Sequence, residues 1–172
     1  MSGRILIAGI GNIFLGDDAF GVEVIRELSS RVWPDDVRVV DFGVRGYDLA
    51  FALTDGYEAA ILVDAVERGE PPGTTYLVEI DGAELSKLDP DSLNAHSLSP
   101  VSVLQMAQSL GGVGGKLFLV GCEPATLESL DGQIGLSDAV RPAVTQALEL
   151  IESLASDLLR SKRAPTAGFM PG

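Results

Sequence analysis

Three side chains in this sequence have the chemistry of metal ligands. Asp18 is the second of two adjacent aspartates that follow the apolar segment Arg4–Ile10. Asp64 ends another apolar run, and His96 is the only histidine in the chain. Carboxylate oxygens and an imidazole nitrogen suit a borderline divalent ion such as nickel, zinc or iron. If the three converge, the sequence predicts a metal site of two carboxylates and one imidazole.

Each of these residues also has a structural interpretation. Acidic residues at the start of a helix cap its N–H groups and complement its dipole. One aspartate is enough for that role, so Asp17 is predicted to cap and Asp18 is left for a ligand. Asp64 could instead cap a helix or stabilise a turn, and a single histidine is often structural. Spacing alone does not decide, because the residues come from different loops.

The glycines before the aspartates match only part of a dinucleotide-binding motif. Gly9-x-Gly11 follows a predicted strand, and Asp41 ends the next strand, where a ribose-binding acid belongs. Phe14, however, occupies the position of the third glycine in G-x-G-x-x-G, and the helix begins too late to meet a pyrophosphate. Two carboxylates at the helix start would also repel phosphate. These residues therefore argue against dinucleotide binding.

Nucleophilic catalysis has weaker support. The sequence contains neither an H-E-x-x-H helix nor a G-x-S-x-G elbow. A serine or cysteine triad would need His96 as its base, and no sequence motif identifies a serine or cysteine as its nucleophile. Ser137 is explained as a helix cap, and Cys122, the only cysteine, as a small core residue.

The candidate residues need a scaffold that brings the ends of several strands together. Apolar or alternating patterns predict five strands: Arg4–Ile10, Val37–Asp41, Ala59–Asp64, Thr74–Ile80 and Lys116–Gly121. Only a short turn precedes the fourth strand, which is therefore expected near an edge and can run antiparallel to its neighbours.

Helices are predicted between these strands. They begin at Asp17 or Asp18, cover Tyr47–Leu53, begin again at Pro100 behind the N-cap Ser99, and begin near Ser137. In the last helix, Pro142 is expected to kink the first turn or to mark the true start. The buried stripe of the first helix is predicted to be Phe20, Val24, Leu28 and Val32.

Strands that alternate with helices predict an α/β fold, namely a three-layer α/β/α sandwich around a mostly parallel five-stranded mixed sheet. In such a sheet the carboxyl ends of the first and third strands are neighbours, and ligands bind at that edge. The sequence shows no linker and no internal repeat. Residues 1–160 are therefore predicted to form one domain, and residues 161–172 a flexible C-terminal tail.

Composition narrows the possible partners. The 172 residues include 12 Lys plus Arg against 25 Asp plus Glu, a net charge of -13. This balance argues against nucleic acid and against an anionic membrane surface, because both need clustered positive charge. Neither a signal peptide nor an apolar stretch of about 20 residues is present. The protein is expected to be a soluble, cytoplasmic monomer.

Several motifs resemble those of hydrogenase maturation endopeptidases, the proteases that trim the large subunit of nickel-iron hydrogenases. G-I-G-N-I-F-L-G-D-D-A-F-G at Gly9–Gly21 resembles the family signature G-[IV]-G-N-x-L-x-x-D-[DE]-x-x-G. Further matches are D-F-G-V-R-G at Asp41–Gly46, I-L-V-D-A around Asp64, H-S-L-S-P from His96, L-V-G-C-E-P and I-G-L-S. The resemblance covers roughly residues 4–155.

The resemblance implies an aspartic-type endopeptidase with a phosphorylase/hydrolase-like fold and one antiparallel strand. It implies removal of a C-terminal extension from the large-subunit precursor after nickel insertion, with the nickel supplied by the precursor and no organic cofactor. The metal ligands carry over to Asp18, Asp64 and His96, which would also be the catalytic residues. Asp41 and Gly43 fall in a loop that the resemblance places near the substrate.

Two routes to hydrolysis remain open from the sequence. A metal could polarise the carbonyl or lower the pKa of a bound water toward ~7, or a carboxylate could act as a general base. Two other functions also remain. One is a small-molecule or nucleotide-binding module on a Rossmann-like sheet, in which Asp41 and Gly9-x-Gly11 would matter more than His96. The other is a non-catalytic scaffold that chaperones the precursor.

Overall fold

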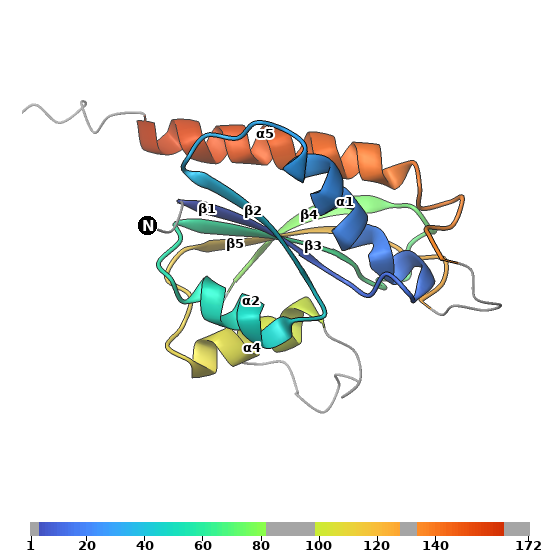
Figure 1. Ribbon diagram of the computed structural model, residues 1–172, viewed down its shortest axis with the longest axis horizontal. Helices are drawn as coiled ribbons and strands as arrows, with labels where there is room; N and C mark the ends of the chain where they lie inside the picture. The colour runs from blue at the N-terminus through green and yellow to red at the C-terminus, as the bar shows by residue number, and fades with distance from the viewer. Residues whose placement is uncertain (1–3, 82–98, 128–133, 164–172) are drawn as a thin grey trace, which may run out of the picture.

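A computed structural model of the chain describes residues 4–81, 99–127 and 134–163 (Figure 1). The strands are β1 (Ile5–Ile10), β2 (Val37–Gly43), β3 (Ala59–Ala65), β4 (Thr75–Ile80) and β5 (Lys116–Cys122). They form one five-stranded sheet in the order β2-β1-β3-β5-β4. Four strands are parallel, and β4 pairs antiparallel with β5 at one edge. The predicted mixed sheet is confirmed, and so is the edge position of β4.

Helices cover both faces of this sheet. α1 (Phe20–Ser29) and α5 (Ala143–Arg163) pack on one face, and α2 (Gly46–Leu53) and α4 (Pro100–Ser109) pack on the other (Figure 1). A short 3-10 helix, η1 (Gly16–Ala19), leads into α1. The arrangement is the predicted three-layer α/β/α sandwich.

The alternation of side chains along the strands builds one core on each face. In β3, Ile61 and Val63 pack toward α1 and α5, whereas Ala60 and Leu62 pack toward α2 and α4. β3 and β1 are buried along their whole length, as expected for central strands covered on both faces. The same alternation directs Asp64, the residue after Val63, toward the α2 and α4 face.

Two predicted helix boundaries are confirmed. The Ser99 hydroxyl accepts a hydrogen bond from the Ser102 backbone N–H at 3.1 Å, and Pro100 is the first residue of α4. Ser99 therefore caps this helix, and the proline needs no N–H at that position. α5 begins at Ala143, directly after Pro142, so this proline marks the true start of the helix.

Two other helix predictions were wrong. Val32 is 99% exposed, because α1 ends at Ser29 and the chain turns before it reaches the predicted fourth stripe position. Ser137 does not cap α5. It precedes a separate turn in which its backbone carbonyl accepts hydrogen bonds from the N–H groups of Val140 and Arg141.

The end of the described chain is helical. α5 continues through Arg163, into the segment that was predicted as a tail from residue 161, and residues 164–172 lie outside the described part. Within the described ranges, no helix is long and apolar enough to cross a membrane.

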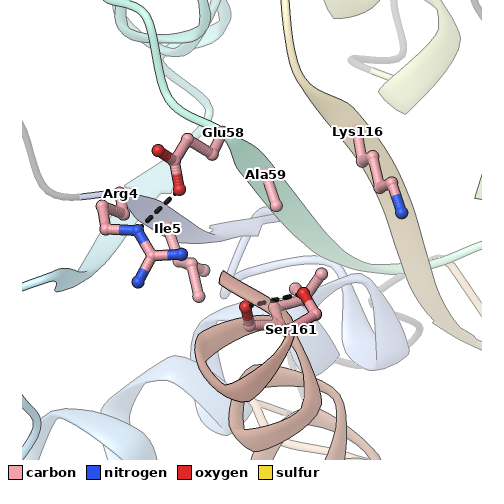
Figure 2. Close-up of a pocket in the computed structure, with 7 residues that line it drawn as sticks. Arg4, Ile5, Glu58, Ala59, Lys116 and Ser161 are labelled. Carbon is pink, nitrogen blue, oxygen red and sulfur yellow. Dashed lines mark hydrogen bonds and ion pairs between the residues drawn. The ribbon is translucent and has the colours of Figure 1, made fainter. Parts of the chain in front are cut away.

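The parallel strands give the sheet two different ends. Ile5, Ala59 and Lys116 begin β1, β3 and β5, and at this amino end a pocket of about 320 Å³ opens beside α5 (Figure 2). Arg4 spans part of its wall and donates from Nε to a Glu58 carboxylate oxygen at 2.6 Å. The predicted site residues lie at the opposite, carboxyl end of the strands, so this pocket is separate from them.

Candidate functional site

Asp64 is a buried carboxylate at the carboxyl end of β3. The residue is only 2% exposed, and its Oδ1 accepts a hydrogen bond from the Ala65 backbone N–H at 2.8 Å. Burial, and then the negative charge of Asp18, raise the pKa of Asp64 well above its ordinary value, while the Ala65 bond lowers it. Such a carboxylate is stabilised by a proton or by a cation beside it.

Asp18 lies in η1, the short 3-10 helix that follows β1. Its Oδ2 accepts a hydrogen bond from the Asn12 backbone N–H at 2.8 Å, and its own N–H donates to the Leu15 carbonyl at 3.1 Å. Burial raises the pKa of Asp18, and the bond from Asn12 lowers it. The negative charge of Asp18 contributes to the raised pKa of Asp64, so the two carboxylates interact electrostatically. The parallel pairing of β1 with β3 confirms that the carboxyl ends of these two strands are neighbours, as predicted.

The glycines of the first motif are positions of close backbone packing. A Cβ at Gly11 would lie 1.9 Å from the Asp18 carbonyl oxygen, and a Cβ at Gly21 would lie 2.2 Å from the Val63 carbonyl oxygen. Gly11 thus lets η1 fold against the end of β1, and Gly21 lets α1 lie directly on the sheet. The motif that resembles a phosphate loop serves to place Asp18.

Asp17 does not cap a helix, which corrects the prediction, since η1 has no side-chain cap. Its fully buried carboxylate accepts hydrogen bonds from Ala125 N–H at 2.8 Å, Thr126 N–H at 3.2 Å, Ser137 N–H at 2.7 Å and the Ser137 hydroxyl at 2.8 Å. These bonds tie the loop of Asp18 to the segments that follow β5 and precede α5. The Ser137 hydroxyl thus holds Asp17, and the residue lies too far before Ala143, the first residue of α5, to cap that helix.

His96 lies outside the described residues. α4 begins at Pro100, a few residues further along the chain, and packs on the face toward which Asp64 is directed. Within residues 4–81, 99–127 and 134–163, no group of three His, Cys, Asp or Glu side chains is placed to hold a metal ion. A metal site of three protein ligands therefore needs a residue from outside these ranges.

Asp41 and Gly43 lie at the carboxyl end of β2, within the strand and not in a loop after it, beside the end of β1. The Asp41 Oδ1 accepts a hydrogen bond from Gly43 N–H at 2.8 Å, and Gly43 has a φ of +54°, which favours glycine. Gly11 N–H donates to the Gly43 carbonyl at 3.0 Å, which joins the carboxyl ends of β1 and β2. Asp41 thus shapes this turn, and contact of the pair with substrate stays a prediction.

Sequence reasoning missed a third buried carboxylate at this end of the sheet, in addition to Asp17 and Asp64. Glu123 is 6% exposed and accepts hydrogen bonds from the backbone of the β3–β4 connection, at Arg68 and Gly69. Tyr76 of β4 lies across Gly121, the residue that pairs with Asp64. The available signal was an acidic residue at the end of the last parallel strand, in L-V-G-C-E-P.

Cys122 is a core residue, as predicted. It is fully buried among the side chains that face α1 and α5. Burial, and then the charges of Asp17 and Glu123, raise the pKa of its thiol to about 12. The thiol stays protonated at neutral pH and is no nucleophile there.

Fold and site together describe an α/β protein with desolvated carboxylates, Asp18 in η1 and Asp64 in β3, at the carboxyl end of the sheet. A family profile for hydrogenase maturation proteases matches residues 22–154. A putative hydrogenase maturation protease of Methanocaldococcus jannaschii is 34% identical over 148 residues, which are 86% of this chain and 93% of that protein. The hydrogenase 2 maturation protease of Escherichia coli is 33% identical over 149 residues, with 86% and 88% covered.

Solved structures agree with these relatives. The hydrogenase maturating endopeptidase HybD from Escherichia coli superposes with a TM-score of 0.72 at 29% identity, covering 90% of this chain and 93% of that one. The chain therefore belongs to the hydrogenase maturation protease family, whose activity is that of an endopeptidase.

Proposed function

We propose that this protease removes the C-terminal extension of a nickel-iron hydrogenase large-subunit precursor, and that it recognises nickel already inserted there. The ligands would be Asp18, Asp64 and His96. The observation that carries the proposal is the Asp18–Asp64 pair, because each carboxylate is desolvated and the charge of Asp18 further raises the pKa of Asp64. A divalent cation between them would compensate both effects.

The nickel belongs to the precursor in this proposal. Two carboxylates and one imidazole leave coordination positions for the precursor's own ligands, so the precursor completes the sphere. Recognition of the metal would then act as a checkpoint, because a precursor without nickel offers nothing for the pair to bind. Bound nickel could also polarise the scissile carbonyl, or Asp64 could take a proton from the attacking water.

Purified protein and nickel-loaded precursor test the site. Asp18→Asn, Asp64→Asn and His96→Ala should each slow processing by at least about 100-fold, which general acid–base loss alone can produce. The matched control is Asp157→Asn, an exposed carboxylate on α5 that pairs with Arg160. Mass spectrometry of the large subunit measures the cut, and circular dichroism confirms folding. Normal processing by all three site variants would reject the assignment.

A second arm tests the checkpoint. The same precursor, prepared without nickel, should bind weakly and remain uncut by the wild-type protease. Equal cleavage of nickel-free and nickel-loaded precursor would remove metal recognition from the proposal while leaving the protease activity intact.

A further inference from the structure

The connection between β3 and β4 is fixed to the end of β5 by one buried carboxylate. Glu123 accepts hydrogen bonds from Arg68 N–H at 2.7 Å and from Gly69 N–H at 3.1 Å. The backbone of Glu123 also bonds to the residues just before β4. Gly73 N–H donates to the Glu123 carbonyl at 2.8 Å, and Glu123 N–H donates to the Thr74 carbonyl at 2.9 Å. The backbone of Arg68 therefore has a defined position at the carboxyl end of the sheet.

The side chain of Arg68 is placed by an aromatic platform. Its guanidinium carbon lies 4.4 Å from the centroid of the Tyr76 ring. That ring packs on Gly121, where a Cβ would lie 2.3 Å from the ring Cζ, and the Tyr76 hydroxyl donates to the Val66 carbonyl at 3.2 Å. Glycine at position 121 leaves the space that lets the tyrosine lie flat beneath the arginine.

Arg68 differs from the other arginines whose side chains the structure describes. Each of the others donates to a carboxylate, carbonyl or hydroxyl oxygen: Arg4, Arg26, Arg31, Arg38, Arg45, Arg141 and Arg160. The exposed guanidinium of Arg68 contacts the Tyr76 ring. Stacking holds the plane of the group without using its N–H donors, so the donors remain available for a planar acceptor such as a carboxylate.

The stacked pair lies next to the candidate site. Tyr76 is the register partner of Gly121, and Gly121 is the register partner of Asp64. Burial is the main reason that the pKa of Tyr76 rises to about 12, and the charge of Asp64 contributes to the rise. A peptide bound at Asp64 could therefore extend to Arg68 along the same end of the sheet.

We propose that Arg68 binds a carboxylate in the C-terminal segment of the precursor and thereby sets which peptide bond lies at Asp64. This inference rests on the proposed function. The carboxylate has two possible sources, an acidic side chain of the extension or the α-carboxylate at its end. Arg68 is a specificity-determining residue in this scheme, and it takes no part in breaking the bond.

Steady-state kinetics on the nickel-loaded precursor test the contact. Arg68→Ala should raise KM about tenfold or more and leave kcat within about twofold, because a contact made equally in ground and transition states changes KM alone. Arg68→Lys should raise KM less than Arg68→Ala does. Its ammonium group keeps the charge but cannot form the two parallel hydrogen bonds that a planar guanidinium makes to a carboxylate. The matched control is Arg26→Ala, an exposed arginine on α1 that pairs with Glu23 and lies outside the site.

Modified precursors identify the partner through a double-mutant cycle. One precursor carries a C-terminal amide, and another has the acidic side chains of its extension changed to amides. On the precursor that lacks the relevant carboxylate, wild type and Arg68→Ala should have the same KM. The proposal is overturned if Arg68→Ala leaves KM unchanged, or if its tenfold effect persists on a precursor with both changes.

Binding of fluorescently labelled precursor, measured with the same variants, separates this inference from the proposed function. If the wild type binds the precursor in an Arg68-dependent way but never cuts it, the proposed cleavage fails and the carboxylate contact stands. If the wild type cuts the precursor and Arg68→Ala matches it in both KM and affinity, only the Arg68 contact is rejected. Failure of the wild type to bind the precursor rejects both.

Discussion

At the scale of single residues, the adjacent aspartates Asp17 and Asp18 have different surroundings and different roles. Asp17 is saturated by four hydrogen bonds, whereas Asp18 accepts one from Asn12 and faces a second carboxylate. Burial raises the pKa of Asp18, and the bond from Asn12 lowers it. The Asp18–Asp64 pair therefore costs stability that a bound cation could return.

Asp64→Asn should make the metal-free protein more stable at neutral pH. The folded protein holds the Asp64 proton more tightly than the unfolded chain does, because burial raises the folded-state pKa. As pH rises from the ordinary aspartate pKa of about 3.9 toward the raised folded value, the wild type loses stability. The amide has no charge to desolvate and keeps an oxygen for Ala65 N–H, so it avoids this loss.

Urea unfolding from pH 3.5 to pH 7.5 measures the effect. The stability difference between Asp64→Asn and wild type should be small below pH 4 and grow as pH rises. Asp157→Asn should show no comparable growth, since its carboxylate is exposed. A difference that favours the wild type at every pH would contradict the proposed cost of the buried charge.

At the scale of elements, the loops at the carboxyl end of the sheet are joined by side chains. Asp17 connects the β1 loop to the segments after β5 and before α5. The carboxyl ends of β1 and β2 are joined through Gly11 and Gly43, and Glu123 holds the β3–β4 connection. Loops have little internal stability, so such ties keep the site residues in one geometry.

Asp17→Ala should lower the free energy of unfolding by about 3–5 kcal/mol, because three backbone N–H groups and the Ser137 hydroxyl lose their buried acceptor. Ser137→Ala is the graded control, since it removes only the hydroxyl bond and should cost about 1.5 kcal/mol. Chemical denaturation measures both values. Equal and small losses in the two variants would show that Asp17 does not tie these segments together.

The positions of most helices and strands could be predicted from the sequence alone. The strand positions, the Ser99 cap and the edge position of β4 were predicted because they depend on local patterns of side chains. The exposure of Val32 and the role of Ser137 were not predicted correctly. The end of α1 and the hydrogen bond of the Ser137 hydroxyl depend on distant parts of the chain. The hydrogen bonds of Asp17 join residues 108 to 120 positions apart, which no local pattern reveals.

At the scale of the whole molecule, the fold by itself leaves the ligand undecided. Open α/β sheets bind many unrelated ligands at the carboxyl ends of their strands. The argument against a nucleotide comes from the strand ends, where Gly11 packs on Asp18 and the negative charges of Asp18 and Asp64 would repel a phosphate.

A thermal-shift comparison of tag-free protein tests this choice. Millimolar nickel should raise Tm by roughly 3 °C or more if it binds the folded state at about ten times its Kd. NAD and ATP, supplied without divalent metal, should leave Tm unchanged. Asp18→Asn and Asp64→Asn should abolish the nickel shift. A nucleotide shift that survives both substitutions would favour the alternative of a nucleotide-binding module.

The sequence by itself determined the order of the elements, the α/β class and the chemical types available at the strand ends. Those properties follow from hydrophobic periodicity and from turn residues, which act over a few positions. Tertiary structure decided that Asp17 joins distant segments by hydrogen bonds and that Asp18 interacts with Asp64. It also decided why Gly11 and Gly21 are glycines and that Arg68 stacks on Tyr76. Each of these depends on contacts between segments far apart in the chain, and the fold alone brings such segments together.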